Sequence, residues 1–172
     1  MVDVGFTKWS TATGAGDLPK VTTTSPPPGS TTHGTSCAEV VADVAPAATI
    51  EPLLLSTRSA TEAWIKDDLP KSKVQILTRS LSSIGGGFDD GTGFWCDSAQ
   101  KVAAQGVLWI NSAGNNADGK VYRGAFSDSD NDGWHEFAGG DERNNFTLNS
   151  TSRIRFQLDW NDYPASAEDY NL

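Results

Sequence analysis

The sequence predicts an α/β fold, a doubly wound parallel sheet with helices on both faces. Two observations lead to this prediction. Short apolar runs typical of strands alternate along the chain with stretches whose apolar residues recur at helical spacing. The clearest run, 107–111, is almost continuously apolar, as are strands of parallel sheets that are covered on both faces. We therefore expect Trp109 to be largely buried in a central strand.

The expected elements follow one another in a simple order. A strand ends at Asp3, a proline-rich loop covers 22–30, and a helix begins at His33. Further strands are expected over 48–55, 74–82 and 107–111, and further helices over 61–69 and 94–105. Pro70 stops the first of these two helices and Gly106 the second. Pro52 restricts its strand to a sheet edge or a bulge.

The composition changes near residue 124, where Asp, Gly and Asn become frequent. Residues 146–148 and 153–160 alternate apolar and polar positions like half-buried antiparallel strands. The sequence thus predicts two domains, 1–123 with the parallel sheet and 124–172 as a β-rich segment resembling the start of a β-sandwich insertion. Two or three strands make a poor independent sheet, so we expect the β-rich segment to be only part of a domain.

Charge and hydropathy exclude several classes of protein. The formal net charge is -9 and the isoelectric point about 4.5. Binding to nucleic acid needs clustered Lys and Arg, so this balance argues against it and suits a soluble or secreted protein. The apolar runs are too short to span a bilayer. No signal peptide precedes Asp3, and we expect the chain to start inside a longer gene product.

The chain has two cysteines, Cys37 and Cys96, and their spacing matches no metal-ligand pattern. Both lie in stretches expected to be helical. Two small buried side chains are the favoured interpretation. A disulfide stays open for an exported protein, because sequence does not show whether the two Cβ atoms are within reach.

Three short segments contain residues suited to acyl transfer. Asp3-Val4-Gly5 ends the first strand, His33-Gly34-Thr35 opens a helix, and Ser112-Ala113-Gly114-Asn115 follows an apolar strand. A carboxylate can orient an imidazole, an imidazole can accept a hydroxyl proton, and a side-chain amide can donate to an oxyanion. Taken singly, the same residues also suit an ordinary turn, an exposed helix start and a loop.

In order and context, these segments resemble three of the four sequence blocks of the subtilisin-like serine peptidases. Val44-Ala45-Pro46 strengthens the resemblance, because the histidine helix of that family ends in such a turn. The resemblance implies a secreted serine endopeptidase that cleaves polypeptides. Asp3 would orient His33, His33 would act as base and then acid, and Asn115 would bind the oxyanion.

The fourth block of the family, a downstream Gly-Thr-Ser segment with the nucleophile, has no counterpart in the chain. Ser36 in Gly34-Thr35-Ser36 is rejected as nucleophile because it follows His33 on the same helix. The fragment alone is therefore expected to be inactive and to need the missing part of the catalytic domain. Ser80-Leu81-Ser82 and Gly114 resemble the substrate-binding segments, although the family more often has Ser-Leu-Gly at the first.

An acidic loop carries oxygen ligands at alternate positions, Asp128, Asp130 and Asp132, followed by a glycine. This pattern indicates a Ca²⁺ site. Gly139 stands where an EF-hand requires Glu, so Glu136 or Asp141 would have to complete a different cage. Such loops also occur as solvated turns. The following residues resemble an insertion found in large, multidomain bacterial subtilases.

A second class of function competes with the protease. The chain would then be a catalytically inactive pseudoprotease, or a module whose acidic region binds calcium, sugar or a partner. A downstream Gly-Thr-Ser-small segment would favour the enzyme, and its absence would favour the binding module. No metal is required for the peptidase chemistry itself.

Overall fold

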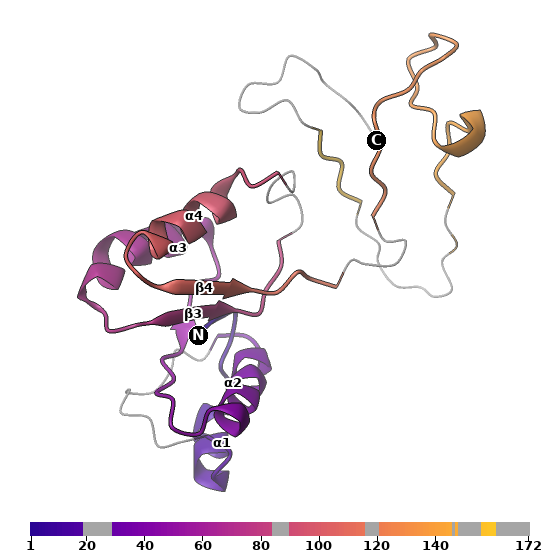
Figure 1. Cartoon of the computed structure of the whole chain (residues 1–172). Helices are drawn as coiled ribbons and strands as arrows, with labels where there is room; N and C mark the ends of the chain where they lie inside the picture. The colour runs from indigo at the N-terminus through magenta and orange to yellow at the C-terminus, as the bar shows by residue number, and fades with distance from the viewer. Residues whose placement is uncertain (19–28, 84–89, 116–120, 146, 148–155, 161–172) are drawn as a thin grey trace. The chain divides into compact units, whose positions relative to one another are not determined.

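The computed structural model describes residues 1–18, 29–83, 90–115, 121–145, 147 and 156–160 (Figure 1). The chain divides into two compact units. The first unit comprises Met1–Gly114 with Leu158–Leu172, and the second comprises Asn115–Gln157. Each unit has its own internal packing and is described by itself below. The domain boundary expected at residue 123 stays a prediction.

The first unit is built on a four-stranded parallel sheet with the strand order β2-β1-β3-β4. The strands are β1 (Val2–Asp3), β2 (Leu53–Leu54), β3 (Ile76–Arg79) and β4 (Leu108–Asn111). The predicted parallel α/β arrangement is thereby confirmed. The second strand is much shorter than predicted and lies at a sheet edge. That position accommodates Pro52, because a proline just before an edge strand breaks no central ladder.

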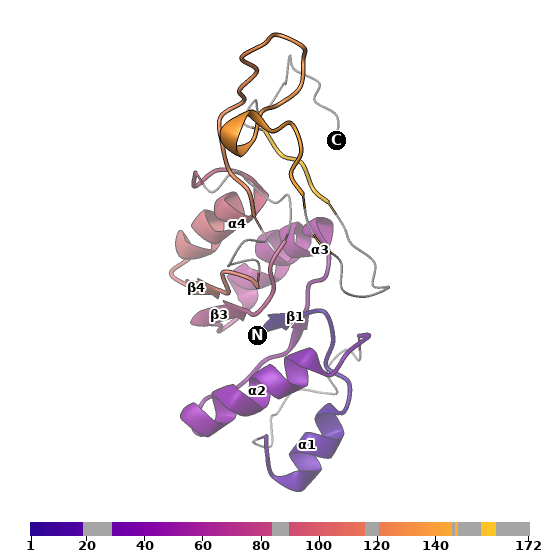
Figure 2. The same cartoon turned by 90° about the vertical axis from the view of Figure 1, so that its right-hand side faces the viewer.

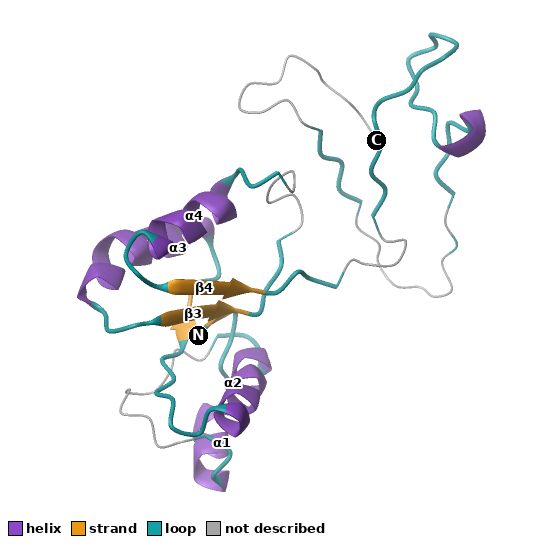
Figure 3. Ribbon diagram, in the orientation of Figure 1, coloured by secondary structure: helices purple, strands orange, loops and turns teal. Residues whose placement is uncertain are grey.

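The helices connect these strands in the expected alternation (Figure 3). They are α1 (Trp9–Ala15), α2 (His33–Val44), α3 (Arg58–Ala63), a π-helical turn η1 (Trp64–Asp68), a 3-10 turn η2 (Leu69–Lys71) and α4 (Phe94–Ala103). Gly106, with a φ of 80°, follows α4 in the left-handed conformation that commonly ends a helix. Helix α1 was not predicted, because its polar sequence lacks a clear apolar periodicity.

The helices lie on both sides of the sheet, with α1 and α2 on one side and α3 and α4 on the other (Figures 1 and 2). Within the sheet, β2 lies on one side of β1, whereas β3 and then β4 lie on the other side, so the direction of the crossovers reverses after β2. If all crossovers have the usual right hand, this reversal places the helices on opposite faces. Each face has its own apolar core. One contains Met1, Phe6, Trp9, Leu18, Ala38 and Ile50, and the other Val2, Trp64, Ile65, Leu77, Val102 and Val107.

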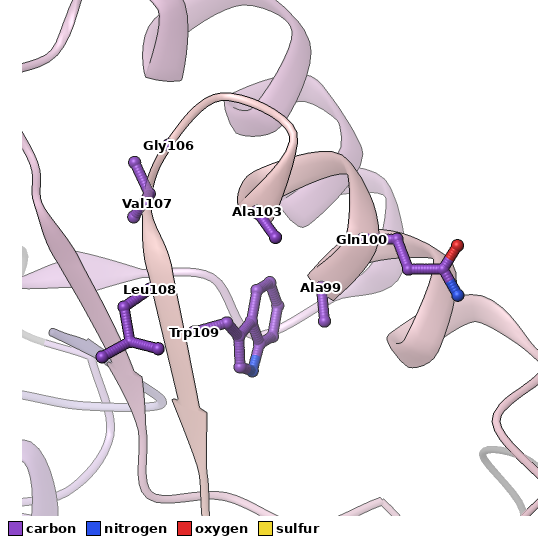
Figure 4. A pocket seen from close by; sticks show the side chains of 7 residues that line it. All are labelled: Ala99, Gln100, Ala103, Gly106, Val107, Leu108 and Trp109. Atoms are coloured by element: carbon purple, nitrogen blue, oxygen red, sulfur yellow. The ribbon is translucent and has the colours of Figure 1, made fainter.

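The prediction that Trp109 is buried in a central strand is wrong. Strand β4 is the edge strand of the described sheet, and Trp109 is half-buried. Figure 4 shows its indole ring lying toward Ala99 and Ala103 of α4, while Leu108 points to the other side of the strand. A shallow open hollow there is lined by seven residues of α4, β4 and the turn that joins them, Ala99, Gln100, Ala103, Gly106, Val107, Leu108 and Trp109. The apolar run reflects a strand with both faces apolar, but no described strand lies beyond it.

The second unit shows no β-strand among its described residues (Figure 3). It contains turns and one short 3-10 segment, η3 (Ala138–Gly140). The strand predicted over 146–148 lies mostly outside the described residues, as do residues 153–155 of the strand predicted over 153–160. Residues 156–160 are described and are not strand. A strand is defined by its pairing, so alternation alone does not create one.

Cys37 on α2 and Cys96 on α4 are free thiols, and both are half-buried rather than buried. No helix among the described residues has the length and apolar character needed to cross a bilayer.

Candidate functional site

Asp3 and His33 meet at the carboxyl end of β1. The Asp3 side chain is fully buried, and its Oδ2 lies 2.7 Å from His33 Nδ1. Its Oδ1 accepts a 2.8 Å hydrogen bond from the backbone N–H of Val4. The His33 side chain is 48% exposed, so the ring is held at one nitrogen and open to solvent over much of its surface. The structure thus brings together Asp3 and His33, the two residues between which the sequence predicts a contact.

Strand alternation explains why Asp3 faces His33. Successive side chains of a strand point to opposite faces of the sheet. Met1 and Val2 accordingly contribute to the cores on the two different sides, Met1 to the core that includes residues of α2. Asp3 lies on the Met1 side, where α2 begins. The side chain of Asp3, the last residue of β1, therefore points toward the first turn of α2, which begins at His33.

Small residues in the two motifs allow α2 to approach β1 closely. The N–H of Gly34 donates to the carbonyl oxygen of Gly5 over 2.9 Å. A Cβ atom on Gly34 would lie 2.6 Å from that oxygen and 2.7 Å from the Asp3 Cβ. Thr35 is buried, and its hydroxyl donates to the carbonyl oxygen of Thr7 over 2.9 Å. The glycine and threonine after His33 thus place the imidazole over the carboxylate.

The predicted substrate-binding residues lie where β3 and β4 end. Ser80 and Leu81 are half-buried and directly follow β3, whereas Ser82 is exposed. Gly114 follows β4 with a φ of 88°, and a Cβ there would lie 2.9 Å from the Ser82 Cβ. The structure therefore brings Ser82 and Gly114 together. Asp3 is the last residue of β1, and Ser80 and Gly114 follow β3 and β4, so all three share the carboxyl edge of the parallel sheet, where such sheets usually bind ligands.

Arg79 anchors the segment that follows β3, and sequence reasoning missed it. One of its terminal nitrogens donates to the Leu81 carbonyl oxygen at 2.8 Å and to Asn111 Oδ1 at 3.1 Å, and the other to Ser83 Oγ at 3.2 Å. Its guanidinium stacks 3.8 Å above the ring of Trp95. Arg79 is only 5% exposed, and this burial lowers its pKa. The feature of the sequence that could have indicated this role is a single Arg at the end of a largely apolar strand.

Asn115, the predicted oxyanion donor, follows β4 closely in sequence and is exposed. It is the first residue of the second unit. Its role relative to His33 stays a prediction.

The three predicted calcium ligands gather in the second unit. Carboxylate oxygens of Asp128, Asp130 and Asp132 all lie within 4.8 Å of one another. Asp128 accepts hydrogen bonds from the N–H groups of Asp132 and Gly133, which closes the loop. A fourth carboxylate, Glu142, has a raised pKa, chiefly because of the negative charge of Asp132.

Glu136 is not grouped with the three carboxylates of Asp128, Asp130 and Asp132. Its two carboxylate oxygens accept hydrogen bonds from the hydroxyls of Ser129 and Ser127, which lower its pKa. Asp141 accepts from the N–H of Arg143. Glu142, which the sequence interpretation did not single out, is therefore the acidic residue that the charges of the loop affect most clearly.

Comparisons with protein-family models, with curated proteins and with solved structures give no match for this chain.

Replacing Gly34 by Ala tests the close approach of α2 to β1. The added methyl group would overlap backbone and Asp3 atoms, so we expect a loss of about 1–3 kcal/mol in the free energy of unfolding. Urea denaturation followed by circular dichroism measures the change. Gly14→Ala in α1 is the matched control, because a Cβ there meets nothing within 4 Å and should stabilise the helix slightly. Equal effects of both substitutions would contradict the proposed packing.

Replacing Arg79 by Ala tests the anchor under the predicted substrate segment. The loss of charge-assisted hydrogen bonds and of the stacked Trp95 contact should destabilise the fold by at least about 2 kcal/mol. Arg58→Ala is the control, since Arg58 is exposed and lies 5.5 Å from the Phe94 ring. We expect the control to cost below about 1 kcal/mol. A small effect at Arg79 would show that this segment is held by other contacts.

Proposed function

We propose that the chain is part of a subtilisin-like serine endopeptidase and supplies its carboxylate, its general base and one wall of its substrate site. The observation that supports this most directly is the 2.7 Å contact between the buried Asp3 carboxylate and His33 Nδ1 at the carboxyl edge of a parallel sheet. It stands together with the sequence resemblance in the three blocks. The subtilisin-like form of the fold is part of the proposal.

In this proposal Asp3, His33 and Asn115 each have a separate role. When Asp3 accepts the Nδ1 proton, the lone pair of His33 lies on Nε2. Nε2 then takes the proton of a serine hydroxyl as that oxygen attacks the peptide carbonyl. The imidazolium that forms is stabilised by Asp3 and returns the proton to the leaving amine. The Asn115 amide is assigned to the oxyanion. In subtilisin itself, loss of such a donor lowers turnover about 10²–10³-fold.

The nucleophilic serine is assigned to additional polypeptide that completes the sheet. Among the described strands, β4 has a neighbour on one side only. Ile76, Leu108 and Ile110 are 55%, 57% and 49% exposed, and they share the sheet face opposite Leu77. Val40 and Val44 of α2 are also largely exposed, and α2 lies on the same side of the sheet as this face. Apolar surface of this extent suits a packed continuation of the same domain.

The substrate and the export of the enzyme follow from the resemblance, and the calcium site follows from the alternating carboxylates of the acidic loop. The substrate is an extended polypeptide that lies along 80–82 and Gly114, and the enzyme is exported. The acidic loop of Asp128, Asp130 and Asp132 holds Ca²⁺ as a structural ion.

A fluorophosphonate probe tests the peptidase, because it reacts with an activated serine. Residues 1–172 alone should stay unlabelled, and a product that also carries the Gly-Thr-Ser segment should be labelled. His33→Ala should abolish labelling, since loss of the histidine in subtilisin lowers turnover about 2 × 10⁶-fold. His135→Ala is the control and should retain labelling, because His135 contacts Tyr122 in the second unit.

Two results would contradict this assignment. Labelling of residues 1–172 at Ser36 would overturn the rejection of that serine. A product with all four blocks that is never labelled would favour the pseudoprotease, in which the acidic loop and the sheet face serve binding alone.

Calcium binding is tested by the pKa of Glu142 as well as by calorimetry. Without metal, the charges of Asp132 and Asp130 raise this pKa. Bound Ca²⁺ would offset those charges, so the pKa should fall when Ca²⁺ is added, as followed by nuclear magnetic resonance. Asp130→Asn should abolish the heat of binding. Asp43→Asn, on the exposed face of α2, should leave it unchanged. If Ca²⁺ leaves the pKa of Glu142 unchanged and produces no heat of binding, the proposed calcium site is wrong.

A further inference from the structure

Arginine side chains from two other elements lie against the first turn of α4. Arg79, the last residue of β3, places its guanidinium carbon 3.8 Å from the centre of the Trp95 ring. Arg58, the first residue of α3, places its guanidinium carbon 5.5 Å from the centre of the Phe94 ring. Phe94 and Trp95 are the first two residues of α4 and pack edge to face. Two positive charges are thus concentrated at one helix end of a chain whose formal net charge is -9.

The backbone at the N-terminus of α4 adds to this positive charge. Gly93, the N-cap residue, has no side chain that could accept a hydrogen bond from the helix. Among the described residues, the N–H groups of Phe94, Trp95 and Cys96 have no hydrogen-bond acceptor. Free N–H groups and the helix dipole together make such an end positive, which favours a bound anion.

The charge of Arg79 has no negative partner in the described part of the chain. The residue is only 5% exposed, and its described hydrogen bonds all go to uncharged oxygens. Its Nε is buried without a hydrogen-bond partner, and so is Nε1 of Trp95. Asp97, the acidic residue in the first turn of α4, is exposed and forms no described ion pair with Arg79 or Arg58. A buried charge is costly without a partner, so a negatively charged group close by would stabilise this arrangement.

We propose that the first turn of α4, together with Arg58 and Arg79, binds a carboxylate group. The N–H groups of residues 94–96 donate to the carboxylate oxygens. Arg58 is exposed, and its planar guanidinium adds parallel hydrogen bonds to the two oxygens. Arg79 acts mainly through its fixed positive charge, because its Nε is closed off from solvent. The site therefore selects an anion over a neutral ligand of the same shape.

The first turn of α4 lies at the carboxyl edge of the sheet, which also carries the proposed substrate segment 80–82. Helix α4 follows the parallel strand β3 in the chain, so it begins at the edge of the sheet where β3 ends. Arg79 connects the two places, because it donates to the Leu81 carbonyl oxygen and stacks on Trp95. One source of the carboxylate is therefore an acidic side chain of the polypeptide substrate, and this source rests on the proposed function. The other source is an acidic residue of the polypeptide that completes the sheet.

Sodium acetate is the probe for the site itself, with sodium chloride at equal ionic strength as the reference. In residues 1–172, nuclear magnetic resonance should show saturable shifts of the 94–96 N–H signals with acetate that chloride does not reproduce. Arg58→Ala should weaken acetate binding at least about threefold, because it removes a charged donor. Arg143→Ala is the matched control, since it removes an exposed arginine from the second unit, and it should leave acetate binding unchanged.

A substitution of the opposite sign checks that the binding is electrostatic. Asp97→Asn should tighten acetate binding about two- to fivefold, because it removes a negative charge from the first turn of α4. Asp43→Asn, in α2, should leave it unchanged. Arg79→Gln should weaken binding at least about threefold, and circular dichroism checks that it is folded. If Arg79→Gln unfolds, the exposed Arg58 and Asp97 decide the matter. Absence of a saturable shift with acetate, or equal affinities in Arg58→Ala, Asp97→Asn and the unaltered chain, overturns the proposal.

Peptide hydrolysis distinguishes the two sources of the carboxylate in a product that a fluorophosphonate labels. If the substrate supplies it, a peptide with Glu should have a kcat/KM at least about threefold above the same peptide with Gln. Arg58→Ala should then abolish this difference, and Arg143→Ala should retain it. If the additional polypeptide supplies the carboxylate, the two peptides should be cleaved equally and acetate should no longer shift the 94–96 N–H signals.

The two assays separate this site from the proposed function. Acetate binding by residues 1–172, without labelling of any product that carries all four blocks, would contradict the peptidase and support the carboxylate site. Labelling of such a product, without acetate binding by residues 1–172, would support the peptidase and overturn the carboxylate site.

Discussion

The seating of α2 on the carboxyl end of β1 is the constraint on which the candidate site depends. Asp3 is fully buried, and an unpaired carboxylate in that position would cost several kcal/mol. Its partners are the N–H of Val4 and the ring of His33, so the need to satisfy the carboxylate also determines where the imidazole lies. The close approach is possible because Gly34 has no side chain to meet Gly5. Orientation of His33 and packing of the helix are therefore one requirement.

A second anchor holds the other strand ends. Arg79 is buried beneath the segment after β3, bonds to the Leu81 carbonyl and Asn111, and stacks on Trp95. These contacts link β3, β4 and α4 at the edge of the sheet where Asp3 also lies. The carboxyl edge is thus assembled from two buried charged groups, one on each side of the sheet, with the backbone between them. The apolar cores position the strands, and the charged groups position the loops.

The sequence by itself determined the α/β alternation, the strand end at Asp3, the helix start at His33 and the grouping of Asp128, Asp130 and Asp132, because each depends on local periodicity, helix signals or loop chemistry. Only the tertiary structure decided that β4 lies at an edge of the described sheet and that Trp109 is half-buried. It also decided that Arg79 bonds to the Leu81 carbonyl oxygen and that the charge of Asp132 raises the pKa of Glu142. An apolar strand has the same local pattern whether or not a neighbour pairs with it. Contacts between distant segments likewise depend on the packing of whole elements, which no local pattern encodes.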